Sequence, residues 1–535
     1  MRSVIRKIAL IVFTIVVIIT AWYVYRVVSE PAVYVTSYGA AGQVSGSLHV
    51  LKTGNSLGFI DCGNFYPEGE GDYEERLERA NKMSAQLPFR AKTVDYVILT
   101  HAHLDHIGRL PLLVKKGFKG TIYVTPGTAK LMHPMIKSAV RYSPLKRKWV
   151  YSKYNFMKSQ KHNKPLIAHW NNCKYRKKIK RKKTFKGTLE EMEDELDLSI
   201  SPCRVCANME RDKIMGLVEV VSPGEIFHPS NDITATFIPN YHIPGSASVF
   251  LGVEHKGNGK TLLFSGDVGK RKDILHKSIF PLPKADYVWL ESTYGDFRRD
   301  TTLRPYQLID HFRNHVQSEL NKGNLVWIPA FALDRTQKVL YALSLLNDNY
   351  VNIYVPSPLA NIFNIIYKKE YKTKQNGWFR KIYQRNLFPH YYPYLPEEEL
   401  SGKEILITTT GMLDNGVSES LLDELLPRND VSIFLVGYQD PGTPGGQLKA
   451  GKNIVKWSGK TYMVNASVFS YNFFSAHADM NDALFLLKRQ DKKRTHIYLI
   501  HGEPSALQAR RQKLKEHGFK NVDISVNAKK IIIFK

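Results

Sequence analysis

Short apolar runs separated by glycine-containing turns dominate the chain from residue 32 onward and predict strands. The run over 94–100 is long enough for a buried strand, and it leads into a histidine-rich turn and a helix that begins near Ile107. A charged stretch over 73–86 has a helical pattern. Strands that lead into polar turns and helices predict sheets sandwiched between layers of helices. The predicted strands cover 32–37, 47–51, 57–60, 94–100, 233–238, 248–253, 261–265, 287–290, 495–499 and 529–534.

Residues 305–459 follow another pattern, in which helices and strands alternate regularly. This alternation is typical of a parallel, doubly wound sheet. The predicted helices cover 305–320, 336–346, 360–371 and 418–426, and the predicted strands cover 325–328, 352–355, 404–408 and 432–436.

The first pattern returns after residue 459, so the second domain is expected to be inserted into the first. We predict an N-terminal segment over 1–31, a first domain over 32–304, an inserted α/β domain over 305–459, and a return to the first domain over 460–535. An irregular insertion over about 137–215 interrupts the first domain.

The N-terminal segment contains an uncharged apolar run of eighteen residues, 8–25. A helix of this length, at about 1.5 Å per residue, nearly spans the hydrocarbon core of a bilayer. Basic residues flank the run and aromatic residues lie near its end, which favours a single-pass anchor in contact with membrane lipid, in the inner membrane of a bacterium. A cleaved signal peptide is the alternative, but its apolar region is normally shorter. The flanking charges favour an external domain, but the side of the membrane stays open.

The net charge of +27 is unusual for a chain of otherwise ordinary globular composition. Its largest concentration lies at 174–186, where nine of thirteen residues are Lys or Arg. Such a surplus favours polyanions, either phosphate backbones or anionic lipid headgroups. A solvated basic surface is the plain alternative.

The sharpest chemical signal is the sequence His101-Ala102-His103-Leu104-Asp105-His106 at the end of the strand predicted over 94–100. Alternate side chains of an extended backbone point the same way, so His101 and His103 can bind one ion. The turn into the following helix then directs Asp105 and His106 toward a neighbouring position. Imidazole and carboxylate together suit zinc, and this arrangement predicts a closely spaced pair of ions.

This motif resembles the HxHxDH signature of hydrolases with the metallo-β-lactamase fold. Asp61 in Ile-Asp-Cys-Gly, His242 in Tyr-His-Ile-Pro-Gly-Ser and Asp267 in Ser-Gly-Asp match further motifs of that superfamily in the expected order. Each is weak alone, but their order and their setting at strand ends make them specific together.

Three later residues resemble motifs of the β-CASP branch, the nucleic-acid-processing branch of that superfamily. They are Glu291 in Leu-Glu-Ser-Thr-Tyr-Gly, His477 in Ser-Ala-His-Ala-Asp and His501 in Ile-His-Gly-Glu. Histidine at the third of these positions goes with RNA-directed members of the family. The similarity covers most of the chain from about Val35 onward, and it points to the bacterial and archaeal relatives of the eukaryotic pre-mRNA 3′-end cleavage endonuclease.

The resemblance implies an αββα sandwich of the metallo-β-lactamase type with an inserted, doubly wound β-CASP domain, preceded here by one transmembrane helix. It also implies two Zn²⁺ ions and a role for each matching residue. His101, His103 and His242 would bind one zinc, while Asp105, His106 and His501 would bind the other, with Asp267 shared. His477 would act as the general acid, oriented by Glu291, and Asp61 would position the histidine loop.

The inserted domain contains stretches similar to β-CASP consensus sequences, and they suggest substrate-binding residues. These are Arg335, Gln337, Ser357, Thr410 and Tyr438. The sequence departs from the family at Asp334, where glycine is usual, at Pro356, where an acid is usual, and at Gly446-Gln447, where arginines are common. The departures put substrate preference in more doubt than the metal chemistry.

The insertion contains three of the four cysteines. His169 with Cys173, and Cys203 with Cys206, have spacings suited to one structural zinc ion. Buried free thiols are the alternative.

The expected function is a zinc-dependent phosphodiesterase that hydrolyses RNA, internally or from the 5′ end, in RNA processing or decay. The alternatives are a DNA-directed nuclease of the same family, a small-molecule metallo-hydrolase and a non-catalytic RNA-binding subunit. Small-molecule hydrolases lack the inserted domain and the pair formed by His477 and Glu291, and inactive relatives usually lose metal ligands. RNA is the expected partner, and a homodimer stays open.

Overall fold

The computed structural model describes residues 12–20, 33–142, 204–299, 302–344, 346, 351–372, 391–392, 400 and 402–534. Residues 12–20 are helical with exposed side chains, and the rest of the expected membrane span over 8–25 lies outside the described residues. Within the described ranges, no helix is both long and apolar enough to cross a bilayer.

Two seven-stranded sheets form the first domain and stack face to face. Side chains from both sheets fill the space between them, including Val35, Tyr96, Val249 and Trp289. The first sheet has the order β22 (Lys530–Phe534), β1 (Val33–Ser37), β2 (His49–Lys52), β3 (Leu57–Ile60), β4 (Tyr96–Ile98), β5 (Thr121–Val124), β6 (Val218–Val220). The second has the order β21 (Asn521–Ile524), β20 (His496–Ile500), β11 (Tyr287–Glu291), β10 (Asn258–Phe264), β9 (Ala247–His255), β8 (Ile233–Pro239), β7 (Ile226–Ser230).

Helices cover the outer face of each sheet, because each sheet also has an apolar outer side. Leu113, Met132 and Ile214 pack from three helices against the first sheet. Leu486 and Leu507 pack from two helices against the second sheet. The layers confirm the predicted αββα sandwich. The helices are α4 (Leu110–Lys115), α5 (Pro126–Tyr142) and α9 (Arg204–Met215) on the first sheet, and α17 (Met480–Leu486) and α18 (Pro504–Glu516) on the second.

The inserted domain contains a six-stranded sheet in which every neighbouring pair is parallel. Its order is β14 (Tyr391–Tyr392), β13 (Ile353–Tyr354), β15 (Ile405–Thr408), β12 (Leu325–Pro329), β16 (Val431–Leu435), β19 (Ser467–Ser470). Phe312, Val339 and Ala360 cover one face of the sheet from α10 (Pro305–Asn321), α11 (Arg335–Leu343) and α12 (Pro358–Lys372). Helices on both faces confirm the doubly wound arrangement.

The other face of this sheet differs in detail from the sequence prediction. The helix predicted over 418–426 is two short helices, α14 (Gly416–Ser420) and α15 (Leu422–Leu425), separated at Leu421. The expected domain boundary at residue 459 falls inside the hairpin of β17 (Ile454–Trp457) and β18 (Lys460–Met463). The sheet continues past that boundary, because β19 pairs with β16.

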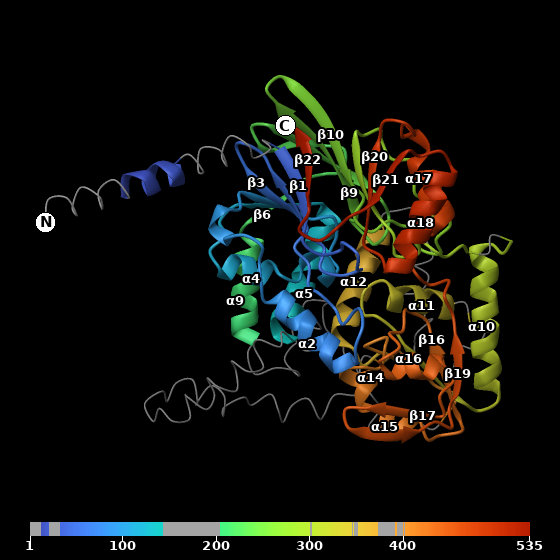
Figure 1. Cartoon of the computed structure of the whole chain (residues 1–535). Coiled ribbons are helices and arrows are strands. Elements are labelled where there is room, and N and C mark those ends of the chain that lie inside the picture. Colours follow the sequence, from blue (N-terminus) through green and yellow to red (C-terminus); the bar gives the residue numbers. More distant parts are fainter. Residues whose placement is uncertain are drawn as a thin grey trace, which may run out of the picture.

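The two domains lie against each other, with the inserted domain in the lower part of Figure 1. A buried ion pair joins Arg76 on α2 (Tyr73–Ser84) to Asp440 in the loop after β16, with 2.7 Å between Nη1 and Oδ2. Tyr438 donates its hydroxyl proton to Glu503 Oε1 across 3.2 Å. These contacts hold the inserted domain over the end of the sandwich at which the carboxyl ends of β4, β11 and β20 lie.

Candidate metal centre

The ends of four strands deliver the candidate ligands to one place. The histidine loop follows β4, His242 follows β8, Asp267 follows β10, and His501 directly follows β20. The chain reaches the same edge of the sandwich at each of these ends, which is where the loops of such sheets form sites. Their side chains are buried or nearly so, because the two sheets and the inserted domain surround them.

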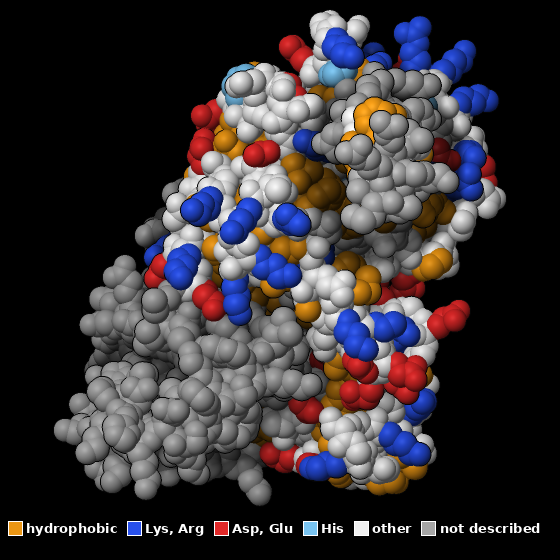
Figure 2. Space-filling model, turned by 60° about the vertical axis from the view of Figure 1, so that its left-hand side comes forward, with side chains coloured by type: hydrophobic (Ala, Val, Ile, Leu, Met, Phe, Trp, Pro, Cys, Tyr) orange, Lys and Arg blue, Asp and Glu red, His pale blue; other side chains and the backbone are white. Residues whose placement is uncertain are grey.

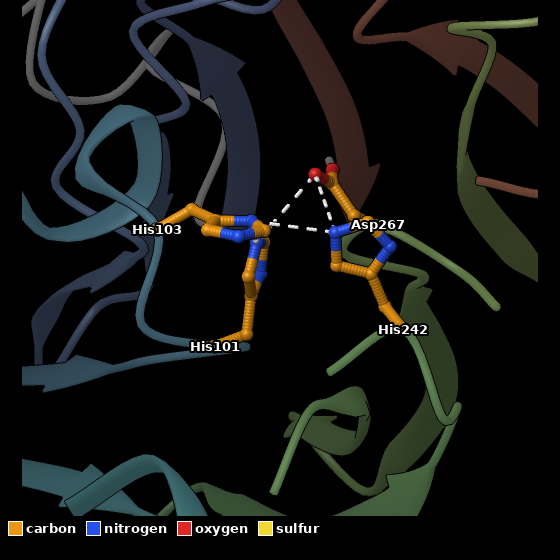
Figure 3. Close-up of side chains that lie close together, drawn as sticks. All are labelled: His101, His103, His242 and Asp267. Carbon is orange, nitrogen blue, oxygen red and sulfur yellow. Dashed lines mark hydrogen bonds and ion pairs between the residues drawn. The ribbon is translucent and has the colours of Figure 1, made fainter. Parts of the chain in front are cut away.

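His101, His103, His242 and Asp267 form the first group, shown in Figure 3. His103 Nδ1 lies 3.0 Å from His101 Nε2 and 3.3 Å from His242 Nε2. Asp267 Oδ2 lies 3.5 Å from His101 Nε2 and 3.7 Å from His242 Nε2. The three nitrogens and the oxygen therefore converge on one point, as the sequence predicted for these residues.

Asp105, His106, Asp267 and His501 form the second group. Asp267 Oδ1 lies 3.2 Å from His106 Nε2 and 3.3 Å from His501 Nε2. Asp105 Oδ2 lies 3.4 Å from His501 Nε2. Asp267 therefore directs one carboxylate oxygen to each group, which is the geometry of a carboxylate shared by two neighbouring ions.

The groups fit metal ions by their chemistry as well as by their spacing. Asp267 Oδ1 accepts no hydrogen bond although two imidazole nitrogens lie within 3.3 Å of it, and His242 Nδ1 also has no partner among the described residues. Buried polar atoms normally have hydrogen-bond partners. An oxygen and two nitrogens that face each other at this distance without forming hydrogen bonds are instead placed to bind one cation together. Neutral imidazole and carboxylate are ligands that zinc prefers.

The electrostatics of the second group also favour a cation. Burial alone would raise the pKa of Asp267, but the imidazoles of His501 and His106 hold it well below its usual range. Burial alone would lower the pKa of His501, yet Asp267 and Asp105 raise it to about 9. The carboxylates thus favour positive charge beside them. A bound metal ion can provide that charge in place of protons on the imidazoles.

Asp61 lies behind the second group and contacts the histidine loop. Its Oδ2 lies 2.7 Å from His106 Nδ1, which leaves His106 Nε2 to face Asp267. The backbone N–H of Thr100 donates to Asp61 Oδ1 at 2.8 Å, and Ser47 Oγ donates to Asp61 Oδ2 at 3.1 Å. Thr100 and Ser47 could not be predicted from the sequence, because a buried hydroxyl has no distinctive spacing.

Gly63 allows this loop to approach the strand end. A Cβ built at Gly63 would lie 1.4 Å from the carbonyl oxygen of Asp105. Any other residue would therefore displace the backbone that bears Asp105 and His106.

His477 and Glu291 lie together beside the first group. His477 Nδ1 is 3.3 Å from Glu291 Oε1, and the His477 ring is 4.5 Å from that of His242. Glu291 is buried and accepts hydrogen bonds from the backbone N–H groups of Val268 and Thr293. Burial alone would raise the pKa of Glu291, but His477 lowers it. The carboxylate therefore stays ionised and orients the imidazole.

Two further residues near the site were not predicted from the sequence. Thr293 Oγ1 lies 3.0 Å from His501 Nδ1, so it orients that ring with Nε2 toward Asp267. Arg299 donates from Nη2 to the carbonyl oxygen of His477 at 2.6 Å and so fixes the loop that bears His477. Thr293 lies within the Leu-Glu-Ser-Thr-Tyr-Gly motif that contains Glu291, and Arg299 lies four residues after that motif. A search of the residues around Glu291 could therefore have found both.

The five suggested substrate-binding residues lie in different environments. Gln337 and Ser357 are buried, and Gln337 Nε2 donates to Asn364 Oδ1 at 2.7 Å. Arg335 donates to the carbonyl oxygen of Val436, and Thr410 donates to Asp414. Tyr438 is half exposed and reaches Glu503, two residues after His501. The structure therefore places Tyr438 best for contact with a bound molecule.

The expected structural zinc site falls largely outside the described residues. His169, Cys173 and Cys203 lie there, and Cys206 is described only as a position in α9. That site stays a prediction.

Three family models match successive parts of the chain. The model of the metallo-beta-lactamase superfamily matches residues 60–303, that of the beta-Casp domain residues 336–448, and that of a Zn-dependent metallo-hydrolase RNA specificity domain residues 461–525.

Ribonuclease TTHA0252 of Thermus thermophilus is 28% identical over 498 residues, which cover 89% of this chain and 94% of that protein. Probable RNase MJ4 of Methanocaldococcus jannaschii is 25% identical, covering 90% and 96%. Endoribonuclease ysh1 of Schizosaccharomyces pombe is 26% identical, and the match covers 87% of this chain but only 53% of that protein.

Proposed function

Because the chain belongs to the β-CASP family of metallo-β-lactamase-fold ribonucleases, we propose that it is a two-zinc phosphodiesterase that hydrolyses RNA. The observation that carries the proposal is the position of Asp267, whose two oxygens each face a separate group of buried histidines. The pair formed by His477 and Glu291 beside those groups supplies the acid that cleavage of a phosphodiester needs.

The proposal assigns each ligand to one ion. His101, His103 and His242 hold the first zinc, Asp105, His106 and His501 hold the second, and Asp267 holds both. A pair of such ions supplies Lewis acidity toward the phosphate and lowers the pKa of water. Asp61 and Thr293 keep His106 and His501 in the tautomers that present Nε2.

The proton for the leaving oxygen comes from His477. Its side chain is 19% exposed, so a substrate can reach it, whereas Glu291 is fully buried behind it. The ionised Glu291 holds the proton of His477 on Nδ1, which leaves Nε2 as the nitrogen that can donate a proton to the substrate. Arg299 and the buried Glu291 keep the ring at a fixed place next to His242.

Several observations favour RNA over the other substrate classes. The model that matches residues 461–525 is named for RNA specificity, and the relatives are named ribonucleases. A DNA-directed nuclease remains the second candidate within the family, and the histidine at position 501 argues against it. The inserted domain argues against a small-molecule hydrolase, and the complete set of ligands argues against a non-catalytic subunit.

We also propose that residues 8–25 anchor the protein in a membrane as a single pass, on the strength of an uncharged apolar run with flanking basic residues. The mode of cutting, internal or from the 5′ end, and a homodimeric state are left as predictions.

The central experiment incubates the purified full chain, in detergent, with end-labelled single-stranded RNA, the matching DNA and a chromogenic phosphodiester. We expect chelator-sensitive cleavage of RNA that zinc restores, and much weaker cleavage of DNA. Equal cleavage of both would favour a general nuclease. Full activity in metal-free protein would contradict the proposal.

A further inference from the structure

The end of the sandwich opposite the metal centre is strongly basic. Strands β3, β4, β5, β10, β11, β20 and β21 run parallel to their neighbours in this set and end on the side of the metal centre, so the loops that precede them lie at the opposite end. We call the exposed Lys and Arg side chains of these loops the basic end. They are Arg90, Lys92, Lys115, Lys116, Lys119, Lys256, Lys284, Lys488, Arg489, Lys492, Lys493, Arg494, Lys515 and Lys520.

Few acids offset this charge. The exposed acidic side chains in the same loops and the helix ends next to them are Asp95, Glu254, Asp491 and Glu516. Figure 2 shows the side of the molecule that is on the left in Figure 1, and blue Lys and Arg side chains lie at its top and across its middle, with red Asp and Glu side chains between them. The basic end is therefore a broad cationic surface rather than one short run.

The loops from both sheets belong to one surface. Ser56, in the β2–β3 turn, donates to Ser230 at the end of β7 at 3.2 Å, which joins the two sheets at this end. His255, at the β9–β10 turn, lies 5.6 Å from the ring of Phe534. Phe534 in turn pairs with Val33, the first residue of β1. The chain therefore enters the first domain at the basic end.

This entry point ties the basic end to the apolar N-terminal run. Only seven residues, 26–32, separate that run from Val33. A chain of eight peptide steps reaches at most about 28 Å, whatever its conformation. The apolar run therefore ends within that distance of Val33, which lies at the basic end, whereas the metal centre is at the other end of the strands.

We propose that the basic end lies against the anionic headgroups of the membrane that holds the N-terminal run, so that the metal centre faces away from the bilayer. Lys and Arg gain attraction to an anionic leaflet once they come within a Debye length of it, about 8 Å at physiological salt. The tether is short enough for the basic end to reach that layer, and the charge of the basic end then holds it there. The proposal rests on the membrane anchor proposed above. RNA is the other polyanion that could bind, but the tether favours lipid and the metal centre lies at the opposite end.

The test compares two kinds of vesicle. The full chain is reconstituted in phosphatidylcholine alone and in phosphatidylcholine with about one third phosphatidylglycerol, and outward-facing chains are modified with a membrane-impermeant amine reagent. We expect several-fold weaker modification of Lys284, Lys493 and Lys520 in the anionic vesicles, reversed by high salt, and equal modification of Lys449 and Lys452 on the inserted domain. Equal modification of all five lysines in both vesicles would overturn the proposal.

Charge reversal supplies a matched control. The variant Lys116→Glu/Lys493→Glu/Arg494→Glu should raise the modification of Lys284 and Lys520 in anionic vesicles to the level in neutral ones, and it should cleave RNA in detergent as the wild type does. The variant Lys449→Glu/Lys452→Glu/Lys456→Glu, on the inserted domain, should keep the protection. If the first variant instead loses RNA cleavage in detergent, the basic end serves RNA and the proposal is wrong.

The same experiment separates this proposal from the anchor. Failure of the chain to float with neutral vesicles would refute the anchor. Protection of the basic end in anionic vesicles would then still show a lipid-binding surface, and its absence would refute both.

Discussion

Lys338 of the inserted domain and Asp273 of the first domain form an ion pair, with 3.1 Å between Nζ and Oδ2 and neither side chain exposed. Lys270 adds a second cation to Asp273 at 3.1 Å, and Asp334 pairs with Lys338 at 2.9 Å. Lys270 also donates to the carbonyl oxygen of Phe473, four residues before His477. This buried cluster therefore joins the loop after Asp267, the inserted domain and the segment that bears the proposed acid.

The first prediction concerns the stability of this cluster. Lys338→Met keeps the volume of the side chain but leaves Asp273 and Asp334 buried with less positive charge. Removal of one partner of a buried ion pair typically costs about 3–5 kcal/mol. We expect a clear fall in the denaturant concentration at the midpoint of unfolding, measured by circular dichroism. Lys460→Ala, at the exposed pair with Asp423, is the control and should leave the midpoint unchanged; a midpoint for Lys338→Met as high as that control would contradict the interpretation.

The second prediction concerns pH. Burial alone would raise the pKa of Asp273, but Lys270 and Lys338 hold it well below its usual range. A depressed carboxyl pKa stabilises the fold above the unfolded-state pKa, about 3.9, and that contribution is lost as the pH falls toward the folded-state value. The difference in unfolding free energy between the wild type and Asp273→Asn should therefore be constant above about pH 5 and shrink below pH 4. A difference that does not change with pH would show that Asp273 acts through packing alone.

The third prediction concerns His477. The variant His477→Ala should keep both metal ions, because His477 belongs to neither group, and should lose RNA cleavage by about 10²-fold or more. Metal content by atomic spectroscopy and cleavage of labelled RNA check the two halves. Glu291→Gln should keep metal too and displace the pH profile of cleavage. Loss of metal from His477→Ala would mean that the division of roles is wrong.

The fourth prediction concerns the shared carboxylate. Asp267→Ala should lower the metal content of both groups, whereas His501→Ala should lower that of the second group alone. Direct titration of the metal-free protein with zinc would show the loss of two binding steps in one variant and of one step in the other. Equal losses in both variants would argue for a single ion.

Local pattern predicted sheets between layers of helices and the doubly wound sheet, because periodicity is a local property. The convergence of the seven candidate ligands was implied by the family resemblance, since His242, Asp267 and His501 lie far from the histidine loop in the sequence. The cluster of Lys338 and Asp273 could not be predicted, because nothing in a sequence relates two charged residues from separate domains until the fold buries them together. Asp334 is a related case. Glycine is usual there in the family, and the structure gives Asp334 a φ of +68°, a conformation that favours glycine. Its ion pairs with Lys338 and His276 show what the carboxylate adds.

The environment of the suggested substrate-binding residues could not be predicted either. Gln337 and Ser357 occur in family-like stretches, but their side chains are directed into the inserted domain, where hydrogen bonds hold them. A motif indicates which residues occur together in the sequence, whereas the burial of their side chains depends on how the surrounding helices pack. The break at Leu421 has a similar origin, because apolar spacing alone does not distinguish one helix from two short ones.

The separation of His106 and His501 by 395 positions in the sequence has a consequence for synthesis. Domains generally fold as the chain leaves the ribosome, N-terminal parts first. The group that unites Asp105, His106, Asp267 and His501 cannot assemble until residue 501 emerges, and β1 gains its outer neighbour β22 only when residues 530–534 follow. All ligands of the first group have left the ribosome once Asp267 has emerged, so they are available long before the second group can be completed.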